Sequence, residues 1–398
     1  MSDSVAVLDY GSRWLKAGWA YNFPTEEEPR IMTPSAVHID PDGAGDAAGS
    51  GSSSELHRPI RGGKITNWDE FESLAYYVLY ELLGWELGNE GNIMLCEPLL
   101  TGRPDRETMT QLMFEVFNVT GLFCQDQAVL SLFAFGRTNG LVVDVGHDKV
   151  DVATVTEGQV NPSTVRRLEF GGANLNQYMQ QLMKDPQRQQ QQQQQASGDA
   201  MAVDSGDASS SAQQPQQLSE ETAEALKELC VRVAESEAAF SSSISSSSAP
   251  QTFQLPDGQQ FTVQAGTGLR LGEALFQPTS LLGIRGPNIA EAAVDSAACL
   301  MEPLLRKLMY ENMILVGGGS VIPGISQRFI SEVRAMVPAN ANAVLCPAPE
   351  YLPSPSVPRD AVWVGGAVLA KVALIQNHFI VKADYEEAGP AAVHRRCT

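Results

Sequence analysis

Two short segments, far apart in the chain, carry the same polar turn between apolar runs. Asp9 and Gly11 lie in VLDYGSRWLKAG, and Asp144 and Gly146 lie in VVDVGHDKVDVA. Each pattern predicts a β-hairpin with an Asp-x-Gly sequence at its turn. Glycine lets the backbone N–H groups approach an anion closely, and a carboxylate can reach toward a divalent cation. Two such hairpins therefore predict a site for a phosphate-bearing ligand with a metal ion.

A glycine-rich turn follows later in the chain, in MILVGGGSVIPG, between a strand-like run and a helix-like segment. Gly317, Gly318 and Gly319 at this turn could close over a nucleotide base and ribose. One Asp-x-Gly turn is a weak signal because both residues favour turns for local reasons. Two of them with a triple glycine predict a nucleotide cleft. The chain has no GxxxxGK[ST] sequence, which excludes the P-loop class.

The elements that must position these turns alternate between strand and helix. Residues 93–100 form an apolar run typical of a buried strand, and 106–119 repeat apolar residues at helical spacing. Ser219 precedes two acidic residues, as at a helix N-terminus, and predicts a helix over 219–235. This alternation predicts an α/β fold with a hairpin at the start of each half.

The composition fits a globular chain with low-complexity insertions. Its 398 residues can form two or more lobes with sizeable cores, and 43% of them are hydrophobic. Residues 41–55, 185–218 and 241–250 are rich in Gly, Ser and Gln and poor in apolar side chains. Such segments bury too little apolar surface to offset the entropy of ordering. We expect all three to be loops or disordered.

Charge and cysteine usage bound the function classes. The net charge of −20, without a cluster of Lys and Arg, argues against direct DNA binding. A basic protein partner fits this charge, which can equally serve solubility alone. The six cysteines have no metal-binding spacing and read as reduced thiols of an intracellular protein. We expect neither a secretory signal nor a membrane span.

Eight segments, in the same order along the chain, resemble the family of actin and the actin-related proteins. They are DYGSRWLKAGWA, PIRGGKITNWDEFE, FEVFNVTGLFCQDQAVLSLFAFGRTNGLVVDVG, LPDGQ, GEALFQP, LVGGGSVIPGISQRF, AVWVGGAVLAKVA and VKADYEEAGPAAVHRRC. The resemblance implies the actin-like α/β fold, a duplicated ribonuclease H-like fold with two lobes and a central nucleotide cleft. The implied first lobe comprises residues 1–135 and the C-terminal segment 360–398, with an outer subdomain at about 32–69. The implied second lobe comprises residues 136–359, with an outer subdomain at about 171–295.

The resemblance also implies a site for ATP or ADP with Mg²⁺. Asp9 and Asp144 would hold the metal through water. The residues implied to contact the nucleotide are Asp9, Gly11, Ser12, Arg13, Lys16, Asp144, Gly146, Glu220, Gly317, Gly318, Gly319 and Arg359.

Several positions depart from the family pattern. Asp148 stands where the family has a glycine facing phosphate, and we expect its carboxylate to repel the ligand. Gln127 matches the residue that positions the attacking water, but Asp151 replaces its histidine partner. The adenine-facing positions are also altered, at Ala223, Leu226 and Lys227. We expect no catalysis, Gln127 and Asp151 being a degenerate catalytic pair, and weak or absent nucleotide binding.

Within the family, the segment YVLYELLGWELGNEGNIMLCEPLL and the tail KADYEEAGPAAVHRRC most resemble a plant-type nuclear member. This implies a non-catalytic structural subunit of a SWI/SNF-type chromatin-remodelling complex, in the nucleus with cytoplasm as a second location. The implied partners are a basic helix of the motor ATPase and a second nuclear actin-related protein or actin. Trp363 and Phe379 are the expected anchors for that helix. The alternatives are a cytoskeletal actin-related protein and an active ATPase or kinase.

Overall fold

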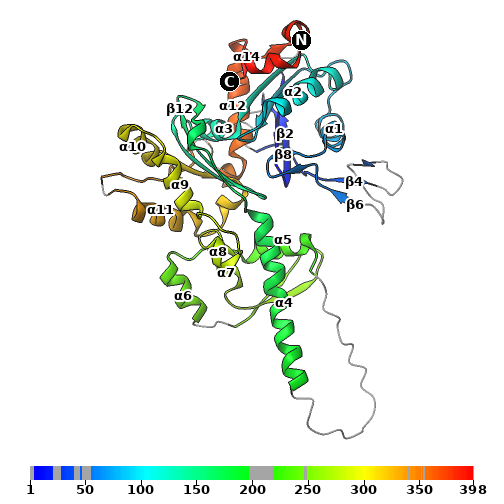
Figure 1. Ribbon diagram of the computed structural model, residues 1–398. Helices are drawn as coiled ribbons and strands as arrows, with labels where there is room; N and C mark the ends of the chain where they lie inside the picture. The colour runs from blue at the N-terminus through cyan, green and yellow to red at the C-terminus, as the bar shows by residue number, and fades with distance from the viewer. Residues whose placement is uncertain are drawn as a thin grey trace, which may run out of the picture. The chain divides into compact units, whose positions relative to one another are not determined.

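The computed structural model describes residues 4–20, 28–39, 45–46, 55–196, 218–245, 249–338, 340–350, 352 and 355–397 (Figure 1). The chain forms two compact units. The first comprises Met1–Gly172, Ile289–Val321 and Phe329–Thr398, and the second comprises Ala173–Asn288 and Ile322–Arg328. No helix in the described ranges is long and apolar enough to cross a membrane.

The first unit contains a six-stranded sheet in the order β18-β10-β9-β1-β2-β3. Its first hairpin pairs β1 (Val5–Tyr10) with β2 (Trp14–Trp19), and β1 lies parallel to β9 (Asn92–Glu97). The other strands are β3 (Ile31–Pro34), β10 (Gly121–Asp126) and β18 (Ile380–Val381). Every residue of β1 is buried, because the sheet is covered on both faces.

A second sheet in the same unit repeats this local arrangement. β11 (Gly140–Val145) pairs antiparallel with β12 (Val150–Thr156) and parallel with β17 (Met313–Val316). β13 (Gln159–Val160) and β14 (Arg166–Leu168) complete it by pairing with β12. Each Asp-x-Gly turn thus joins an antiparallel hairpin whose first strand also has a parallel neighbour. The predicted duplication is confirmed in the strand topology.

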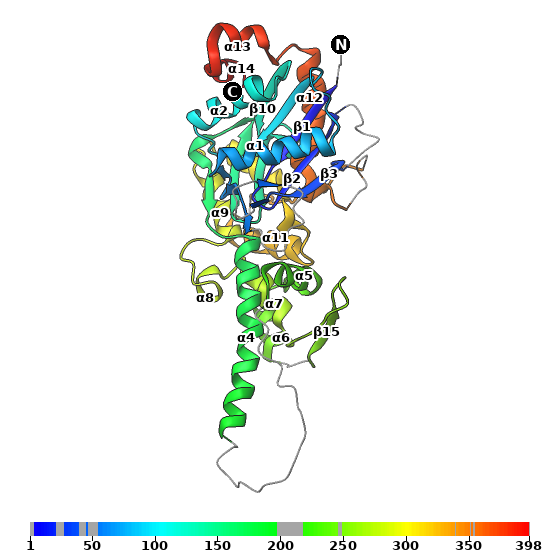
Figure 2. The same cartoon turned by 90° about the vertical axis from the view of Figure 1, so that its right-hand side faces the viewer.

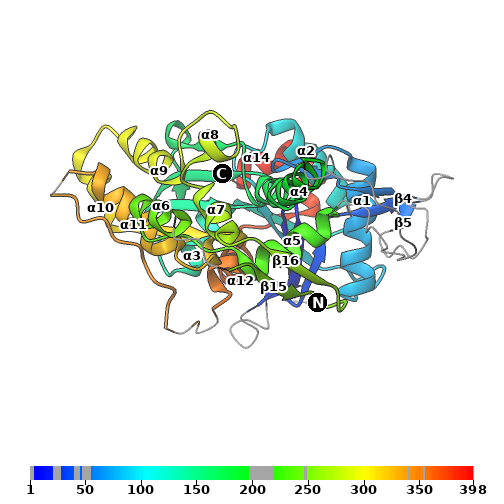
Figure 3. The same ribbon diagram turned by 90° about the horizontal axis from the view of Figure 1, so that it is seen from below.

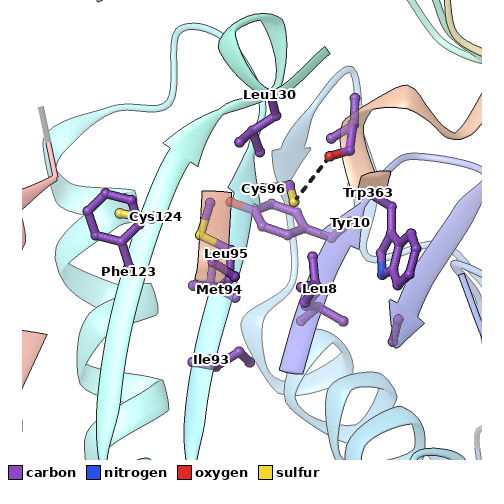
Figure 4. Close-up of a cluster of buried hydrophobic side chains, with 14 of the residues drawn as sticks. Leu8, Tyr10, Ile93, Met94, Leu95, Cys96, Phe123, Cys124, Leu130 and Trp363 are labelled. Carbon is purple, nitrogen blue, oxygen red and sulfur yellow. Dashed lines mark hydrogen bonds between the residues drawn. The ribbon is translucent and has the colours of Figure 1, made fainter. Parts of the chain in front are cut away.

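Helices α3 (Gln127–Ala134) and α12 (Val357–Ile375) pack closely against one another in the first unit. Gly365 lies against the carbonyl oxygen of Leu130, where a Cβ atom would collide with backbone. Trp363 is completely buried and lies against Gly18 of β2, so α12 also contacts the first sheet. Figure 4 shows this core, in which the Sγ atom of Cys96 lies 4.0 Å from the Val362 carbonyl oxygen.

Further elements of the first unit surround these sheets. α9 (Ile289–Ala298) and α10 (Pro303–Glu311) lie side by side, and α9 packs on β12 (Figures 1 and 3). Figure 2 shows the C-terminal helices α13 (Lys382–Ala388) and α14 (Val393–Arg396) near α2 (Arg103–Gln111). The remaining helical segments are α1 (Trp68–Tyr76), η2 (Tyr77–Leu82), η3 (Leu112–Val116), η4 (Pro162–Thr164), η5 (Gly318–Val321), most of α11 (Ile325–Met336) and η6 (Gly389–Ala392).

Two small sheets also belong to the first unit. One joins β4 (Val37–Ile39), β5 (Gly45–Asp46) and β6 (Glu55–His57). The other is the hairpin of β7 (Ile60–Arg61) and β8 (Lys64–Ile65). Its two turn residues, Gly62 and Gly63, have φ angles of 56° and 77°. Two-residue hairpin turns that match the twist of the strands need a left-handed backbone at both turn residues. Only glycine adopts this conformation readily.

The second unit is mainly helical. It contains α4 (Gly172–Ala196), α5 (Glu220–Cys230), α6 (Glu237–Ser245), α7 (Thr267–Glu273), α8 (Pro278–Leu281) and the hairpin β15 (Gln251–Gln254) with β16 (Gln260–Val263). Its core holds a bidentate ion pair between Arg328 and Glu273, with N–O distances of 2.9 and 3.0 Å. Both side chains are buried, and the pairing compensates each charge for its loss of water.

The predicted helices are present with corrected bounds. Ser219 caps α5 by accepting a hydrogen bond from the Thr222 N–H at 3.1 Å, as expected. The helix ends at Cys230 instead of residue 235. The reason is that the following N–H groups bond elsewhere, that of Arg232 to Gly268 O and that of Val233 to Pro323 O. The helix predicted over 106–119 begins earlier, as α2, and ends earlier, as η3.

The prediction that the three low-complexity segments are loops or disordered is only partly correct. α4 continues through the glutamine tract to Ala196, because glutamine favours helix, whereas 197–217 lie outside the described residues. α6 extends to Ser245, so the first half of 241–250 is helical, with serine hydroxyls bonded to preceding carbonyls. In 41–55 the described residues are 45–46 and 55, which lie in strands.

The expected division into lobes at 135/136 stays a prediction, since the compact units have different bounds. The second unit, 173–288 with 322–328, covers most of the outer subdomain that we expected at about 171–295. The outer subdomain expected at about 32–69 lies within the first unit.

We expect Gly365→Ala to destabilise the first unit. A Cβ atom at Gly365 would meet the Leu130 carbonyl, which belongs to a helix and cannot move like a side chain. Overpacking of this kind costs about 1–3 kcal/mol or more. The measurement is urea unfolding followed by circular dichroism. Gly318→Ala is the control, because a Cβ there meets nothing within 4 Å. Equal midpoints for the two variants would contradict the prediction.

Candidate functional site

The first hairpin directs Asp9 and Lys16 to a common point. The two residues are cross-strand partners, and the Gly11 N–H closes the turn on the Trp14 carbonyl oxygen at 3.0 Å. Lys16 Nζ lies 3.9 Å from the Asp9 carboxylate, 3.1 Å from Asp360 and 2.8 Å from the Arg359 carbonyl oxygen. Lys16 is therefore tied to the start of α12.

Asp9 is buried, Asp144 is partly buried, and the charge of Asp144 acts on Asp9. Burial raises the pKa of Asp9 to about 6, with Lys16 opposing this shift and Asp144 adding to it. Burial also raises the pKa of Asp144, against the effect of Lys149. Gln127 donates a hydrogen bond from Nε2 to Asp9 Oδ1 at 2.8 Å. A divalent cation would relieve the repulsion between the two carboxylates, so this pair fits the implied metal position.

The described part of the chain has no group of three or more His, Cys, Asp or Glu side chains placed to hold a metal. A cation bound at Asp9 and Asp144 would therefore take most of its ligands from water and substrate, which is typical of Mg²⁺. The water-mediated role that the resemblance implies for the two residues stays a prediction.

The second hairpin contains an ion-pair network that neutralises Asp151. The Gly146 N–H closes this turn on the Lys149 carbonyl oxygen at 3.0 Å, and Asp144 faces Asp151 across the strands. Asp151 is buried and paired with Lys149 on one side. On the other side Arg167 of β14 donates two hydrogen bonds to it, at 2.7 and 2.8 Å. Asp151 is therefore a paired structural carboxylate.

Asp148 does not have the surroundings that we expected for a residue facing phosphate. Its Oδ2 atom accepts a hydrogen bond from the Gly62 N–H at 2.9 Å, and its Oδ1 atom lies 3.8 Å from His147 Nε2. The predicted repulsion overlooked this donor. A carboxylate held by a backbone N–H has a stable orientation, and its charge is directed toward the β7–β8 turn.

The triple glycine lies beside the second hairpin. Gly317 has a φ angle of 86° and donates its N–H to the Pro358 carbonyl oxygen at 3.0 Å. A Cβ atom at Gly317 would strike the Asp144 carboxylate, and one at Gly319 would strike Val145. Gly318 has open space on its Cβ side. The predicted group of Asp144, Gly146 and these glycines is thus brought together.

Other predicted residues have different surroundings. The Arg13 guanidinium lies over the Trp14 ring, 4.5 Å from its centroid. The Ser12 hydroxyl accepts a bond from the Gly63 N–H at 3.4 Å. Arg359 Nη2 is 2.7 Å from Asp360 Oδ2. Glu220 belongs to the second unit, where it is exposed at the start of α5.

The altered adenine-facing positions also lie on α5. Ala223, Leu226 and Lys227 are all buried in the second unit.

Sequence reasoning missed three residues of this region, Lys149, Arg167 and Asp360. Lys149, in the turn just before β12, and Arg167, on the neighbouring strand β14, gave a faint signal, because both could neutralise the Asp that replaces a histidine. Asp360 gave none, since its contact with Lys16 depends on a helix near the other end of the chain.

Glu97, another buried carboxylate, lies at the end of β9. Burial raises the pKa of Glu97 to about 7, while Arg106 of α2 opposes the shift and Asp126 of β10 adds to it. Arg106 Nε is 2.7 Å from the Glu97 carboxylate and Nη2 is 3.7 Å from that of Asp126. The buried groups Tyr10 and Cys124 also face Glu97.

The fold and these paired hairpins define the class of the protein. The sequence signature described as Actin matches residues 2–398. The chain belongs to the actin family, and the α/β actin-like fold predicted from the sequence is confirmed.

Among curated proteins the chain is similar to plant relatives named Actin-related protein 7. Those of Oryza sativa subsp. indica and subsp. japonica are each 37% identical to it over 392 residues, covering 98% of this chain and 99% of the relative. That of Arabidopsis thaliana is 38% identical over 395 residues, covering 98% and 99%. The expected similarity within the family is thus also confirmed.

We predict that Glu97 makes stability depend on pH. Because the folded-state pKa of about 7 lies above the ordinary glutamate value of 4.5, the folded chain retains a proton that the unfolded chain releases. The stabilisation is complete below about pH 4.5 and is lost as pH rises through about 7. Relative to Glu97→Gln, the wild type should therefore lose thermal stability between pH 5 and pH 8. A difference in melting temperature that is constant across this range would contradict the assignment.

Proposed function

We propose that this actin-related protein is a non-catalytic structural subunit of a nuclear chromatin-remodelling complex of the SWI/SNF type. It would act in chromatin-mediated regulation of gene expression by binding a helix of the motor ATPase. The observation that carries the non-catalytic part is the pairing of Asp151, which stands at a position where the family has a histidine. Both of its neighbours, Lys149 and Arg167, compensate its charge within the fold.

A group that is to polarise water must be able to accept its proton. Asp151 is buried between two cations, so its protonation would break both ion pairs. The side-chain amide of Gln127, the other member of the degenerate pair, donates to Asp9. These engagements support the absence of efficient ATP hydrolysis.

Nucleotide binding is proposed to be weak or absent. Asp9 and Asp144 suit a water-coordinated Mg²⁺, and the Gly11, Gly146 and Gly318 turns suit phosphate and ribose. The cations that would meet the phosphates are already paired, Lys16 with Asp360 and Lys149 with Asp151. Removing one partner of a buried ion pair costs about 3–5 kcal/mol, which corresponds to two to four decades of affinity. ATP or ADP would have to overcome this cost.

The partner surface must differ from the one that we expected. Trp363 and Phe379 were wrong as anchors, because both are buried within the first unit, Phe379 beside Phe123 with ring centroids 5.8 Å apart. The exposed apolar side chains near them are Val372 and Ile375 in the last turns of α12, which are 44% and 81% exposed. Helix ends with such side chains can receive an amphipathic helix.

The charge of the protein favours a basic helix as its partner. A net charge of −20 favours fast, salt-sensitive association with a basic segment, while apolar contacts set the residence time. The proposed partners are a basic helix of the remodelling ATPase and a second nuclear actin-related protein or actin. Direct binding to DNA is not part of the proposal. The proposed location is the nucleus, with cytoplasm as a second location.

The alternative is a cytoskeletal actin-related protein, as a filament or a filament-end component. Family membership is compatible with it. The two proposals differ in their partners, so affinity purification from nuclear extract separates them: recovery of remodelling subunits supports the first, and recovery of filament-end proteins supports the second.

We predict no phosphate release above background from purified protein with Mg-ATP. The reason is the engagement of Gln127 and Asp151 described above. The measurement is a coupled phosphate assay in parallel with polymerising actin. Steady turnover that is abolished by Gln127→Ala would overturn the non-catalytic proposal, whereas turnover unaffected by that change would point to a contaminating enzyme.

We further predict that Ile375→Asp weakens binding of the basic ATPase helix at least about tenfold. A buried charge at an apolar contact would cost more than about 1.4 kcal/mol. Isothermal titration with the helix peptide, alone and with the second actin-like subunit, gives the affinity. Met301→Asp is the matched control, because Met301 is 93% exposed on the turn before α10. Equal losses in both variants would exclude α12 as the docking element.

A further inference from the structure

The β7–β8 turn is held by residues of both Asp-x-Gly hairpins. The N–H of Gly62 donates to Asp148 of the second hairpin at 2.9 Å, and the N–H of Gly63 donates to Ser12 of the first at 3.4 Å. Lys149 also lies against Gly63, where a Cβ atom would meet its side-chain nitrogen. Both amides of this turn thus have their acceptors in the hairpins that would otherwise hold phosphate.

The remaining contacts fix the carbonyl side of the same turn. Arg167 donates to the Gly62 carbonyl oxygen at 3.3 Å and to the Leu99 carbonyl oxygen at 2.6 Å. The same guanidinium makes two bonds with Asp151, which restrict its rotation. A planar guanidinium that satisfies a carboxylate and two carbonyls has little freedom to leave.

The charges of this group cancel. Two carboxylates, Asp148 and Asp151, and two cations, Lys149 and Arg167, give a net charge of zero. These side chains are mostly buried. The exposed fraction is 24% for Asp148, 4% for Asp151, and 11% each for Lys149 and Arg167. Asp151 is bonded to Lys149 and Arg167, and Asp148 is held by the Gly62 N–H, so this neutral group needs no external anion or cation to stay assembled. A phosphate would have to take Lys149 from Asp151 before it gained any attraction.

We propose that these four residues lock the β7–β8 turn onto the two hairpins independently of nucleotide. The lock replaces a ligand with side chains of the chain itself, so adding or removing Mg-ATP leaves the turn in place. Asp148 and Arg167 act as positioning residues, Asp148 through the Gly62 amide and Arg167 through the Gly62 carbonyl. The inference does not rest on the proposed partner, since it concerns contacts within the first unit alone.

The test is hydrogen exchange of the full-length protein, followed by mass spectrometry on peptides that cover residues 59–66. The wild type is compared after nucleotide removal with EDTA and a nucleotide-hydrolysing enzyme, and with added Mg-ATP. We expect the exchange rates of this segment to agree within about twofold. A tenfold or larger slowing by Mg-ATP would overturn the proposal, because the turn would then depend on the ligand.

Two substitutions at one position test the acceptor directly. Asp148→Ala removes it, so exchange in the turn should become about tenfold faster or more. Asp148→Asn is the matched control, because the amide oxygen can still accept from Gly62 while the charge is lost, and it should stay closer to the wild type. Equal exchange in Asp148→Ala and the wild type would overturn the lock. Peptides from α10, elsewhere in the first unit, report whether each variant is folded.

Discussion

The close packing of α12 on α3 is the constraint on which the rest of the first unit depends. Gly365 allows the two helices to approach until the Leu130 carbonyl fills the space of a side chain. That approach places the start of α12 beside both hairpins at once. Asp360 reaches Lys16 of the first hairpin, and the Pro358 carbonyl oxygen receives the N–H of Gly317, next to Asp144. One helix therefore contacts a charged side chain of the first sheet and the glycine turn that lies against Asp144 of the second sheet.

The candidate site compensates its charges mainly within itself. Asp360 lies between Lys16 and Arg359, and Asp151 lies between Lys149 and Arg167. A site built for catalysis usually leaves some charge to be completed by its ligand, since stabilisation must be realised in the transition state. Here the uncompensated feature is the pair Asp9 and Asp144: burial raises both pKa values, and a neighbouring carboxylate adds to each shift, Asp144 for Asp9 and Asp151 for Asp144. The pair would suit a cation, and the cations proposed to face phosphate, Lys16 and Lys149, are paired within the fold.

The side chains available to bind a partner also depend on which residues the core of the first unit uses. Large aromatic side chains that looked suited to bind a partner are used inside the first unit, Trp363 against Gly18 and Phe379 against Phe123. Val372 and Ile375, which lie where α12 ends, are exposed aliphatic side chains. In an actin-related protein that acts through partners, binding energy would then come from a few aliphatic contacts and from charge.

The sequence by itself determined the local features, those that depend only on residues adjacent in the chain. The two hairpins, the Ser219 cap and the glycine-rich turn could be predicted because strand alternation, capping and left-handed backbone are properties of a few adjacent residues. Tertiary structure decided where side chains point. Asp148 faces Gly62 because β7–β8 packs on the second hairpin, 86 residues away in sequence. Lys16 contacts the start of α12, 343 residues from Arg359. No local pattern encodes such pairs, because their distances are set by helix and sheet packing along the whole first unit.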